Sequence, residues 1–211
     1  MSPESRARLI LVSMLLMSAA LHAPGAGLYS DIVHLYKRIY IEGRGWYDGS
    51  REYGLPYIDY KFEYPPLVGV LWSISTLPRA FVGEPWGLYM HYTIQAALII
   101  LLSHTLPVDL RRLSGRGSKP LYIAVLTPSV FTYGVYNWDL VASAFTVRGV
   151  RYAVEGRPFM AGFMVGLASS TKVFPLAAVI PLLMDFRRSS RSIIAGLAAG
   201  TVPLLLFMLT G

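Results

Sequence analysis

The sequence predicts an all-α, polytopic membrane protein with about seven transmembrane helices in short hairpins, plus juxtamembrane helices in the first outer loop. Of its 211 residues, 54% are hydrophobic and only 15% are charged. The mean hydropathy is +0.48. The charges form short clusters between apolar runs, which would have no apolar partner in water. We therefore expect a single membrane domain over residues 1–211 and exclude soluble, disordered and coiled-coil classes.

The first span is expected at residues 9–23, an apolar run that follows Arg6 and Arg8. Basic residues before such a run favour a cytoplasmic amino terminus. The run also has features of a cleaved signal peptide, but Leu21 and Ala23 form a poor cleavage pattern. An uncleaved anchor is therefore favoured over a removed signal peptide.

Residues 24–85 are expected to form an outer loop at the membrane surface. Eight of the 14 tyrosines fall within residues 24–66, where their rings can lie among lipid headgroups with their hydroxyls in water. These are Tyr29, Tyr36, Tyr40, Tyr47, Tyr53, Tyr57, Tyr60 and Tyr64. Ser30 is expected to cap an interfacial helix that begins at Asp31. The apolar run 67–77 is too short to cross a bilayer, so it predicts a re-entrant helix.

Two further single spans complete the outline of the domain. Residues 86–108 are long enough for the second span, and the basic cluster of Arg111, Arg112, Arg116 and Lys119 then lies in the cytoplasm. Residues 192–211 form the last span, which leads outward.

Between these spans, segments 120–147 and 158–186 are too long for one crossing and too short for two full ones. Each is expected to be a helical hairpin that starts and ends on the cytoplasmic side. Polar residues mark the turns: Asn137 and Asp139 in the first hairpin, and residues 169–175 in the second. The prediction is seven crossings in all.

The net charge of +7 agrees with this topology. Twelve of the 19 basic residues but only four of the 12 acids fall on the cytoplasmic side, so the net charge is +8 inside and −1 outside. The excess of basic residues therefore indicates the orientation of the chain in its membrane and no nucleic-acid partner. The plasma membrane is the expected location, with an organelle membrane as the alternative. The sequence has no cysteine, which excludes disulfides and thiolate chemistry. Its four histidines are dispersed, so we expect no metal and no other cofactor.

Lys172 is the clearest functional candidate, because it is an isolated cation between two short apolar helices. It could be a lysine that extends its side chain to the interface at a helix end. A bound anion accounts for it better, and the anion expected in an outward-facing membrane cavity is a lipid phosphate.

The other candidates each have a plain structural alternative. Asp31 could serve only as a favourable charge at a helix amino terminus. His34 lies one turn later on the same face and could orient the Asp31 carboxylate, or be an ordinary surface residue. Asp59 could be a solvated loop acid, and Asn137 with Asp139 could cap the helix that begins at Leu140. Glu63 and Tyr64 complete the set of substrate-binding candidates.

The order of these features resembles the GT-C superfamily of membrane glycosyltransferases. The shared features are an aspartate early in the first outer loop, the FEYPPL sequence at residues 62–67, Asn137 with Asp139, and the TKVFP sequence at residues 171–175. The resemblance is strongest to polyprenyl-phosphate-mannose-dependent mannosyltransferases that build phosphatidylinositol mannosides or glycosylphosphatidylinositols. It implies that Asp31 is the catalytic acid group and that Lys172 contacts the donor phosphate.

We therefore expect transfer of a hexose, with mannose favoured, from a polyprenyl-phosphate sugar to a lipid or glycan hydroxyl at the outer face. Asp31 would act as general base in an inverting single displacement. Such enzymes usually continue beyond seven spans, so the acceptor-binding part is expected to be missing, fragmentary or supplied by a partner membrane subunit. Two alternatives remain: a non-catalytic polyprenyl-phosphate or lipid-binding or transport module, and an inactive GT-C-like assembly subunit.

Overall fold

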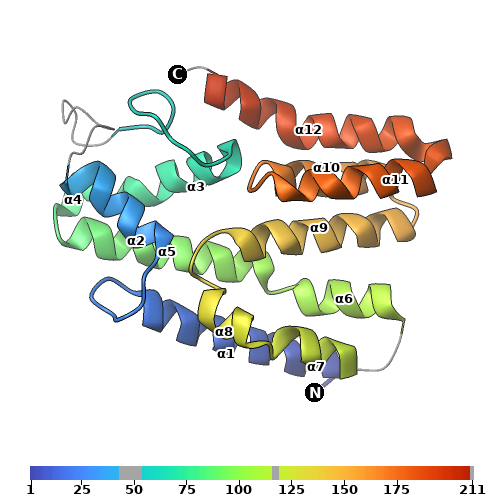
Figure 1. The fold of residues 1–211 in the computed structure, drawn as a ribbon, viewed down its shortest axis with the longest axis horizontal. Helices are drawn as coiled ribbons and strands as arrows, with labels where there is room; N and C mark the ends of the chain where they lie inside the picture. The colour runs from blue at the N-terminus through green and yellow to red at the C-terminus, as the bar shows by residue number, and fades with distance from the viewer. Residues whose placement is uncertain (43–53, 116–118, 210–211) are drawn as a thin grey trace.

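The computed structural model describes residues 1–42, 54–115 and 119–209, which form helices and turns without any strand. The helical fold class is therefore confirmed for these residues. The helices lie in a stack that runs from α1 at one edge to α12 at the other (Figure 1). Tyr47, Tyr53 and Arg116, which were expected in the tyrosine-rich loop and a basic cluster, lie outside the described residues.

The elements follow one another in this order: α1 (Pro3–His22), α2 (Asp31–Tyr36), the π-helical turn η1 (Lys37–Ile41), α3 (Pro66–Thr76), α4 (Arg79–Val82), α5 (Trp86–Ser103), α6 (Leu106–Ser114), α7 (Lys119–Val125), α8 (Pro128–Tyr133), α9 (Asp139–Val154), α10 (Pro158–Ser169), the 3₁₀ turn η2 (Phe174–Ala178), α11 (Val179–Asp185), the 3₁₀ turn η3 (Arg187–Ser189) and α12 (Ser190–Leu209). Prolines begin several of these helices, because the first turn has no carbonyl partner for the N–H that proline lacks. Pro3, Pro66, Pro128 and Pro158 stand in such positions.

Three helical segments are long and apolar enough to cross a membrane: Pro3–His22, Trp86–Ser114 and Arg187–Leu209. The other apolar helices of the described residues are shorter. Helix α10, for example, has 12 residues, which rise about 18 Å of the roughly 30 Å hydrocarbon core. The seven expected crossings are therefore not confirmed.

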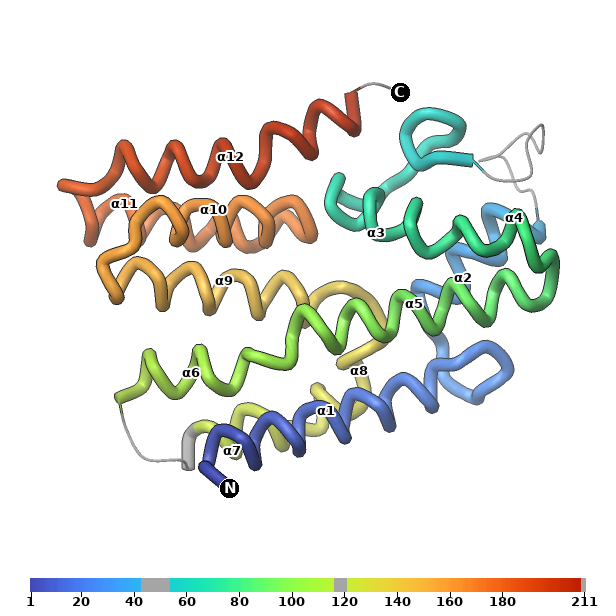
Figure 2. The backbone as a smooth tube through the Cα atoms, turned by 180° about the vertical axis from the view of Figure 1, so that it is seen from behind, coloured from blue at the N-terminus to red at the C-terminus, as the bar shows by residue number. Residues whose placement is uncertain are grey.

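Glycines bring α10 and α12 into backbone contact (Figure 2). Gly162 and Gly166 on α10 face the segment of α12 that holds Gly196 and Gly200. A Cβ atom on Gly162 would lie 1.9 Å from the carbonyl oxygen of Ile193. Only glycine allows this approach, which is a common way for apolar helices to associate without large side chains.

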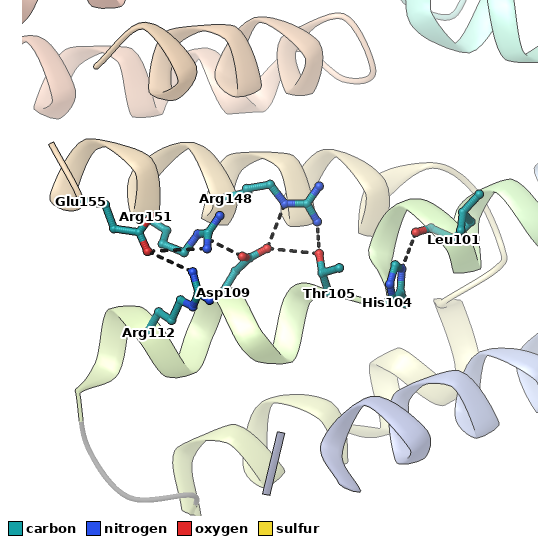
Figure 3. A network of polar contacts seen from close by, with 8 residues as sticks. All are labelled: Leu101, His104, Thr105, Asp109, Arg112, Arg148, Arg151 and Glu155. Carbon is teal, nitrogen blue, oxygen red and sulfur yellow. Dashed lines mark hydrogen bonds and ion pairs between the residues drawn. The ribbon is translucent and has the colours of Figure 1, made fainter. Parts of the chain in front are cut away.

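A buried polar network joins α6 to α9 (Figure 3). Asp109 of α6 is 2% exposed and accepts a hydrogen bond from Arg148 Nε at 3.0 Å. Arg151 Nε lies 3.1 Å from the other carboxylate oxygen, close enough for an ion pair. Both arginines lie inside α9 and not in a loop after a hairpin, because Asp109 compensates their charge there.

Candidate functional site

Tyr64 contacts two ionisable groups of the candidate site. Its hydroxyl donates to Asp31 Oδ2 at 3.1 Å, and Lys172 Nζ lies 5.1 Å from the centre of its ring. Lys172 Nζ also forms an ion pair with Asp139 Oδ1 at 3.0 Å. Four residues that the sequence singled out are thus in continuous contact, and we call them the Tyr64 cluster: Asp31, Tyr64, Asp139 and Lys172.

Helix α2 places Asp31 in this cluster. Asp31 is the first residue of α2, and the Ser30 side chain accepts a hydrogen bond from Val33 N–H at 3.5 Å. The expected cap and helix start are therefore confirmed. Ile32 and Leu35 on the same helix are buried, so their packing fixes the direction in which the Asp31 carboxylate points.

The segment before α3 places Tyr64 beside Lys172. The Tyr57 hydroxyl donates to the carbonyl oxygen of Tyr64 at 2.6 Å. Three residues later, Leu67 N–H donates to the carbonyl oxygen of Ser170 at 2.8 Å. This second bond joins the start of α3 to the turn after α10, which carries Lys172, so residues distant in sequence are held together at one point.

Lys172 is not the isolated cation that the sequence suggested, and this corrects the argument that it needs an external anion. Its side chain is 23% exposed, and its charge is balanced by Asp139, whose side chain is 56% exposed. The Tyr64 ring offers a second favourable contact, because an aromatic face attracts a cation. Any phosphate that approached Lys172 would share it with the more exposed Asp139.

Asn137 supports the start of α9. Its side-chain oxygen accepts a hydrogen bond from Asp139 N–H at 2.9 Å, and the residue is 7% exposed. Helix α9 begins at Asp139, one residue before the expected start, and its N-cap position is Trp138, where no side chain forms a capping hydrogen bond. Asn137 therefore closes a turn before the helix and is not the expected cap. The same bond helps to orient Asp139, the first residue of α9, toward Lys172.

Three tyrosine hydroxyls are influenced by the Asp31 carboxylate. Burial, and secondly the negative charge of Asp31, raises the pKa of Tyr29 and of Tyr64 above its ordinary value. The same two causes raise the pKa of Tyr136 to about 12. All three hydroxyls therefore stay protonated at neutral pH and can act as hydrogen-bond donors around Asp31.

The remaining sequence candidates lie around or outside the Tyr64 cluster. His34 is exposed, with its ring 5.2 Å from that of Tyr29. Asp59 is not brought to the cluster, because its carboxylate accepts Leu55 N–H at 2.7 Å and thereby closes its own turn. Glu63 is exposed next to Tyr64, and its negative charge contributes to the raised pKa of that tyrosine.

Sequence reasoning missed Tyr29, Tyr136 and Trp138 as individual site residues. The tyrosine-rich composition was visible, but it does not say which rings face Asp31. Trp138 is fully buried, and its ring lies 4.9 Å from that of Tyr64. For Tyr136 and Trp138 the available signal was the YNWD sequence at 136–139, in which they alternate with Asn137 and Asp139.

Residues 62–211, which include three of the four Tyr64 cluster residues, match the family model of glycosyltransferase family 87. The chain belongs to glycosyltransferase family 87. Asp31 lies before the matched range. Comparisons with curated proteins and with solved structures gave no match.

Family 87 is a GT-C-type family, so the GT-C resemblance is confirmed, and the chain is a membrane glycosyltransferase. Such an enzyme requires a sugar donor and an acceptor. The Tyr64 cluster offers this family 87 protein a carboxylate for proton transfer and a cation for a leaving group within one set of contacts.

Two small cavities of this family 87 protein are lined by a Tyr64 cluster residue or by sequence neighbours of one. One has a volume of about 350 Å³, and its lining includes Tyr29, Ser30 and His34. The other, about 180 Å³, is lined in part by Asp139 and Tyr133. A larger apolar groove of about 660 Å³ lies between α1 and α5. Of the two smaller cavities, the 180 Å³ one is lined by a member of the Tyr64 cluster, Asp139, whereas the 350 Å³ one is lined by residues that flank Asp31 in the sequence and not by Asp31 itself.

Metal-ligating side chains are sparse in the part of the chain that the structure describes. No group of three or more histidine, aspartate or glutamate side chains is placed there to hold a metal ion. Within the Tyr64 cluster, Asp139 is paired with Lys172, whereas the Asp31 carboxylate accepts a hydrogen bond from the neutral Tyr64 hydroxyl.

Proposed function

We propose that this glycosyltransferase transfers a hexose, with mannose favoured, from a polyprenyl-phosphate sugar to a hydroxyl of a lipid or glycan acceptor. One observation carries the proposal: Tyr64 touches both a carboxylate and an ammonium group, at Asp31 and Lys172. Transfer from a phosphate-linked sugar needs these two groups: a base for the acceptor hydroxyl and a cation for the departing phosphate.

Asp31 serves as the general base. In a single displacement the acceptor oxygen attacks the anomeric carbon, the bond from that carbon to the phosphate oxygen breaks, and Asp31 takes the hydroxyl proton. The attack comes from the face opposite the leaving group, so the anomeric configuration inverts. The Tyr64 hydroxyl orients the carboxylate by its hydrogen bond. A positioned base of this kind contributes about 10² to 10⁴ in rate.

Lys172 stabilises the departing polyprenyl phosphate. Negative charge grows on the phosphate oxygen as the bond to the sugar breaks, so a preformed ammonium group favours the transition state over the ground state. Asp139 holds the ammonium group in place before the donor binds. Because Asp139 is the more exposed of the pair, it can turn toward water or a sugar hydroxyl when the phosphate arrives.

Most of the other candidates contribute substrate contacts in this proposal. His34 lines the 350 Å³ cavity together with Ser30, which directly precedes Asp31, and the proposal assigns the acceptor to this cavity. Glu63 and Asn137 are assigned to sugar or acceptor hydroxyls, whereas Asp59, which bonds Leu55 N–H outside the Tyr64 cluster, is not.

The proposal also places the amino terminus in the cytoplasm and the Tyr64 cluster on the outer face of the plasma membrane. Because the sequence has no cysteine, single cysteines can be labelled without a background signal. A cysteine at Gly27 should react with an impermeant maleimide in intact cells, and one at Ser114 should react only after lysis. The reverse pattern would contradict the orientation.

The decisive experiment measures sugar transfer in membranes supplied with labelled polyprenyl-phosphate mannose. Asp31→Asn should lower the transfer rate at least 100-fold, within the range for a lost general base, while Asp185→Asn, an exposed carboxylate of α11, should not. Unchanged transfer by Asp31→Asn at matched protein level would refute the assignment. Donor binding by the wild type without any transfer would favour the non-catalytic lipid-binding alternative.

A further inference from the structure

A chain of buried polar side chains runs from α5 to the back of the Tyr64 cluster. Trp138 Nε1 donates to Gln95 Oε1 at 2.9 Å, and Gln95 Nε2 donates to Ser75 Oγ at 2.8 Å. Ser75 Oγ also lies 2.9 Å from His91 Nδ1. Gln95, Ser75, His91 and Trp138 are all fully buried. We call these four residues the Gln95 network.

The hydrogen-bond roles in this network leave the Gln95 amide only one orientation. The Trp138 indole can only donate, so it must face the amide oxygen of Gln95. Ser75 has one hydroxyl hydrogen, which goes to the carbonyl oxygen of Trp72 at 2.9 Å. Ser75 therefore accepts from both Gln95 and His91, and His91 carries its proton on Nδ1. With each role assigned, the plane of the Trp138 ring is set by the network.

Trp138 transmits this constraint to the Tyr64 cluster in two ways. Its ring packs edge-on against that of Tyr64, with an interplanar angle of 68° and centres 4.9 Å apart. Trp138 also directly precedes Asp139, the first residue of α9. The side chain that orients Asp31 and the residue that pairs with Lys172 therefore both depend on where Trp138 sits.

We propose that Gln95 is a positioning residue for sugar transfer: through Trp138 it holds Tyr64 between Asp31 and Lys172. Gln95 is on α5 and belongs to none of the Tyr64 cluster contacts, so it acts only through the tryptophan. The expected effect of Gln95 on the rate of sugar transfer rests on the proposed function. The expected effect on structure, a Tyr64 ring held beneath Lys172, does not depend on that function.

The first test separates turnover from binding. Gln95→Met keeps the length of the side chain but removes both of its hydrogen bonds. Because a displacement of about 1 Å in reacting groups can cost about 100-fold in rate, we expect kcat to fall about 10- to 100-fold, with the donor KM changed less than about threefold. Trp138→Phe should act in the same way, and kcat of the double variant should be no lower than that of the less active single variant, because both changes remove the same Trp138–Gln95 hydrogen bond.

The matched control is Tyr92→Phe. Tyr92 is also buried on α5, and its hydroxyl donates to the carbonyl oxygen of Ala19 at 2.6 Å, which ties α5 to α1. This variant loses one buried hydrogen bond without touching Trp138. Its kcat should stay near that of the wild type. An equal fall in kcat for Tyr92→Phe would show a general loss of helix packing and overturn the proposal.

The second test needs no sugar transfer, so it distinguishes failure of this inference from failure of the proposed function. The chain has only four lysines. Reductive ¹³C-methylation therefore gives few NMR signals, and the Lys172 signal is assigned by its loss in Lys172→Arg. The Tyr64 ring under Nζ should displace this signal by its ring current. Gln95→Met and Trp138→Phe should each move it toward the position of an unstacked lysine, and Tyr92→Phe should not. An unchanged signal in both variants would refute the inference whether or not the enzyme transfers mannose.

Discussion

Replacing Asp109 with alanine should cause a large loss of stability, because it removes the shared partner of two arginines on α9. The Asp109 side chain is 3% exposed, while those of Arg148 and Arg151 are 17% and 9% exposed. Asp109 also accepts a hydrogen bond from the Thr105 hydroxyl at 3.3 Å. Removing one partner of a buried ion pair typically costs about 3–5 kcal/mol, since the remaining charge is left without compensation. We expect Asp109→Ala to fall in this range.

Glu155→Gln is the matched control in the same network. Glu155 approaches Arg112 at 3.5 Å and Arg151 at 3.6 Å, and the Arg112 side chain is 57% exposed. Glu155 is itself exposed, with 32% of its side chain accessible, and ion pairs that water and salt reach contribute about 0–1 kcal/mol. Comparing the stability losses of the Asp109 and Glu155 variants therefore shows how much burial of a carboxylate matters within one network (Figure 3).

The assay is unfolding of the purified protein in mixed micelles, followed by circular dichroism as the fraction of a denaturing detergent increases. A third variant removes all three buried charges: Asp109→Leu with Arg148→Met and Arg151→Met. Because no charge is then left buried, this variant should be close to the wild type in stability. Equal stability of Asp109→Ala and Glu155→Gln, or a triple variant as unstable as Asp109→Ala, would refute the reasoning.

Two further predictions concern helix contact and pH. Gly162→Ala should destabilise the protein by about 1–3 kcal/mol, because its new methyl group would overlap the Ile193 carbonyl oxygen; Gly27→Ala, which meets nothing within 4 Å, should change the same unfolding curve by less than about 0.5 kcal/mol. Because the pKa of Tyr136 is raised from 10.0 to about 12, its contribution to stability should be complete below pH 10 and be lost as the pH rises toward 12. Unfolding curves across this range should show a shallower decline for Tyr136→Phe, and an identical decline would contradict the environment assigned to Tyr136.

Local signals in the sequence were sufficient for several elements that carry the site. Ser30 followed by apolar residues at helical spacing located the start of α2, and the polar residues Asn137 and Asp139 located the start of α9. These features depend on residues a few positions apart, whose hydrogen bonds and packing are decided within one or two helical turns. The candidate residues Asp31, Tyr64, Asp139 and Lys172 were found in the same way, as polar groups at the ends of apolar runs.

Partners distant along the chain could not be read from such patterns. Lys172 looked isolated because its neighbours in sequence are apolar, and only the folded chain brings Asp139 to it. Arg148 was expected in a loop for a similar reason, because nothing in the sequence pairs it with Asp109 on another helix. A buried charge is compensated by an opposite charge that lies close to it in space. The spacing of residues along the sequence does not show which residues of different helices lie close together.

The sequence by itself determined that the chain is helical and apolar, because composition and hydropathy depend only on residue type. It also determined which polar residues would be costly to bury and therefore worth examining. Only the tertiary structure decided that Tyr64 joins Asp31 to Lys172, and that Gln95 holds the tryptophan behind it. Those contacts connect α2, α3, α5, α9 and the turn after α10, and they exist only when the packing of the helices has fixed each side chain against residues far away in the chain.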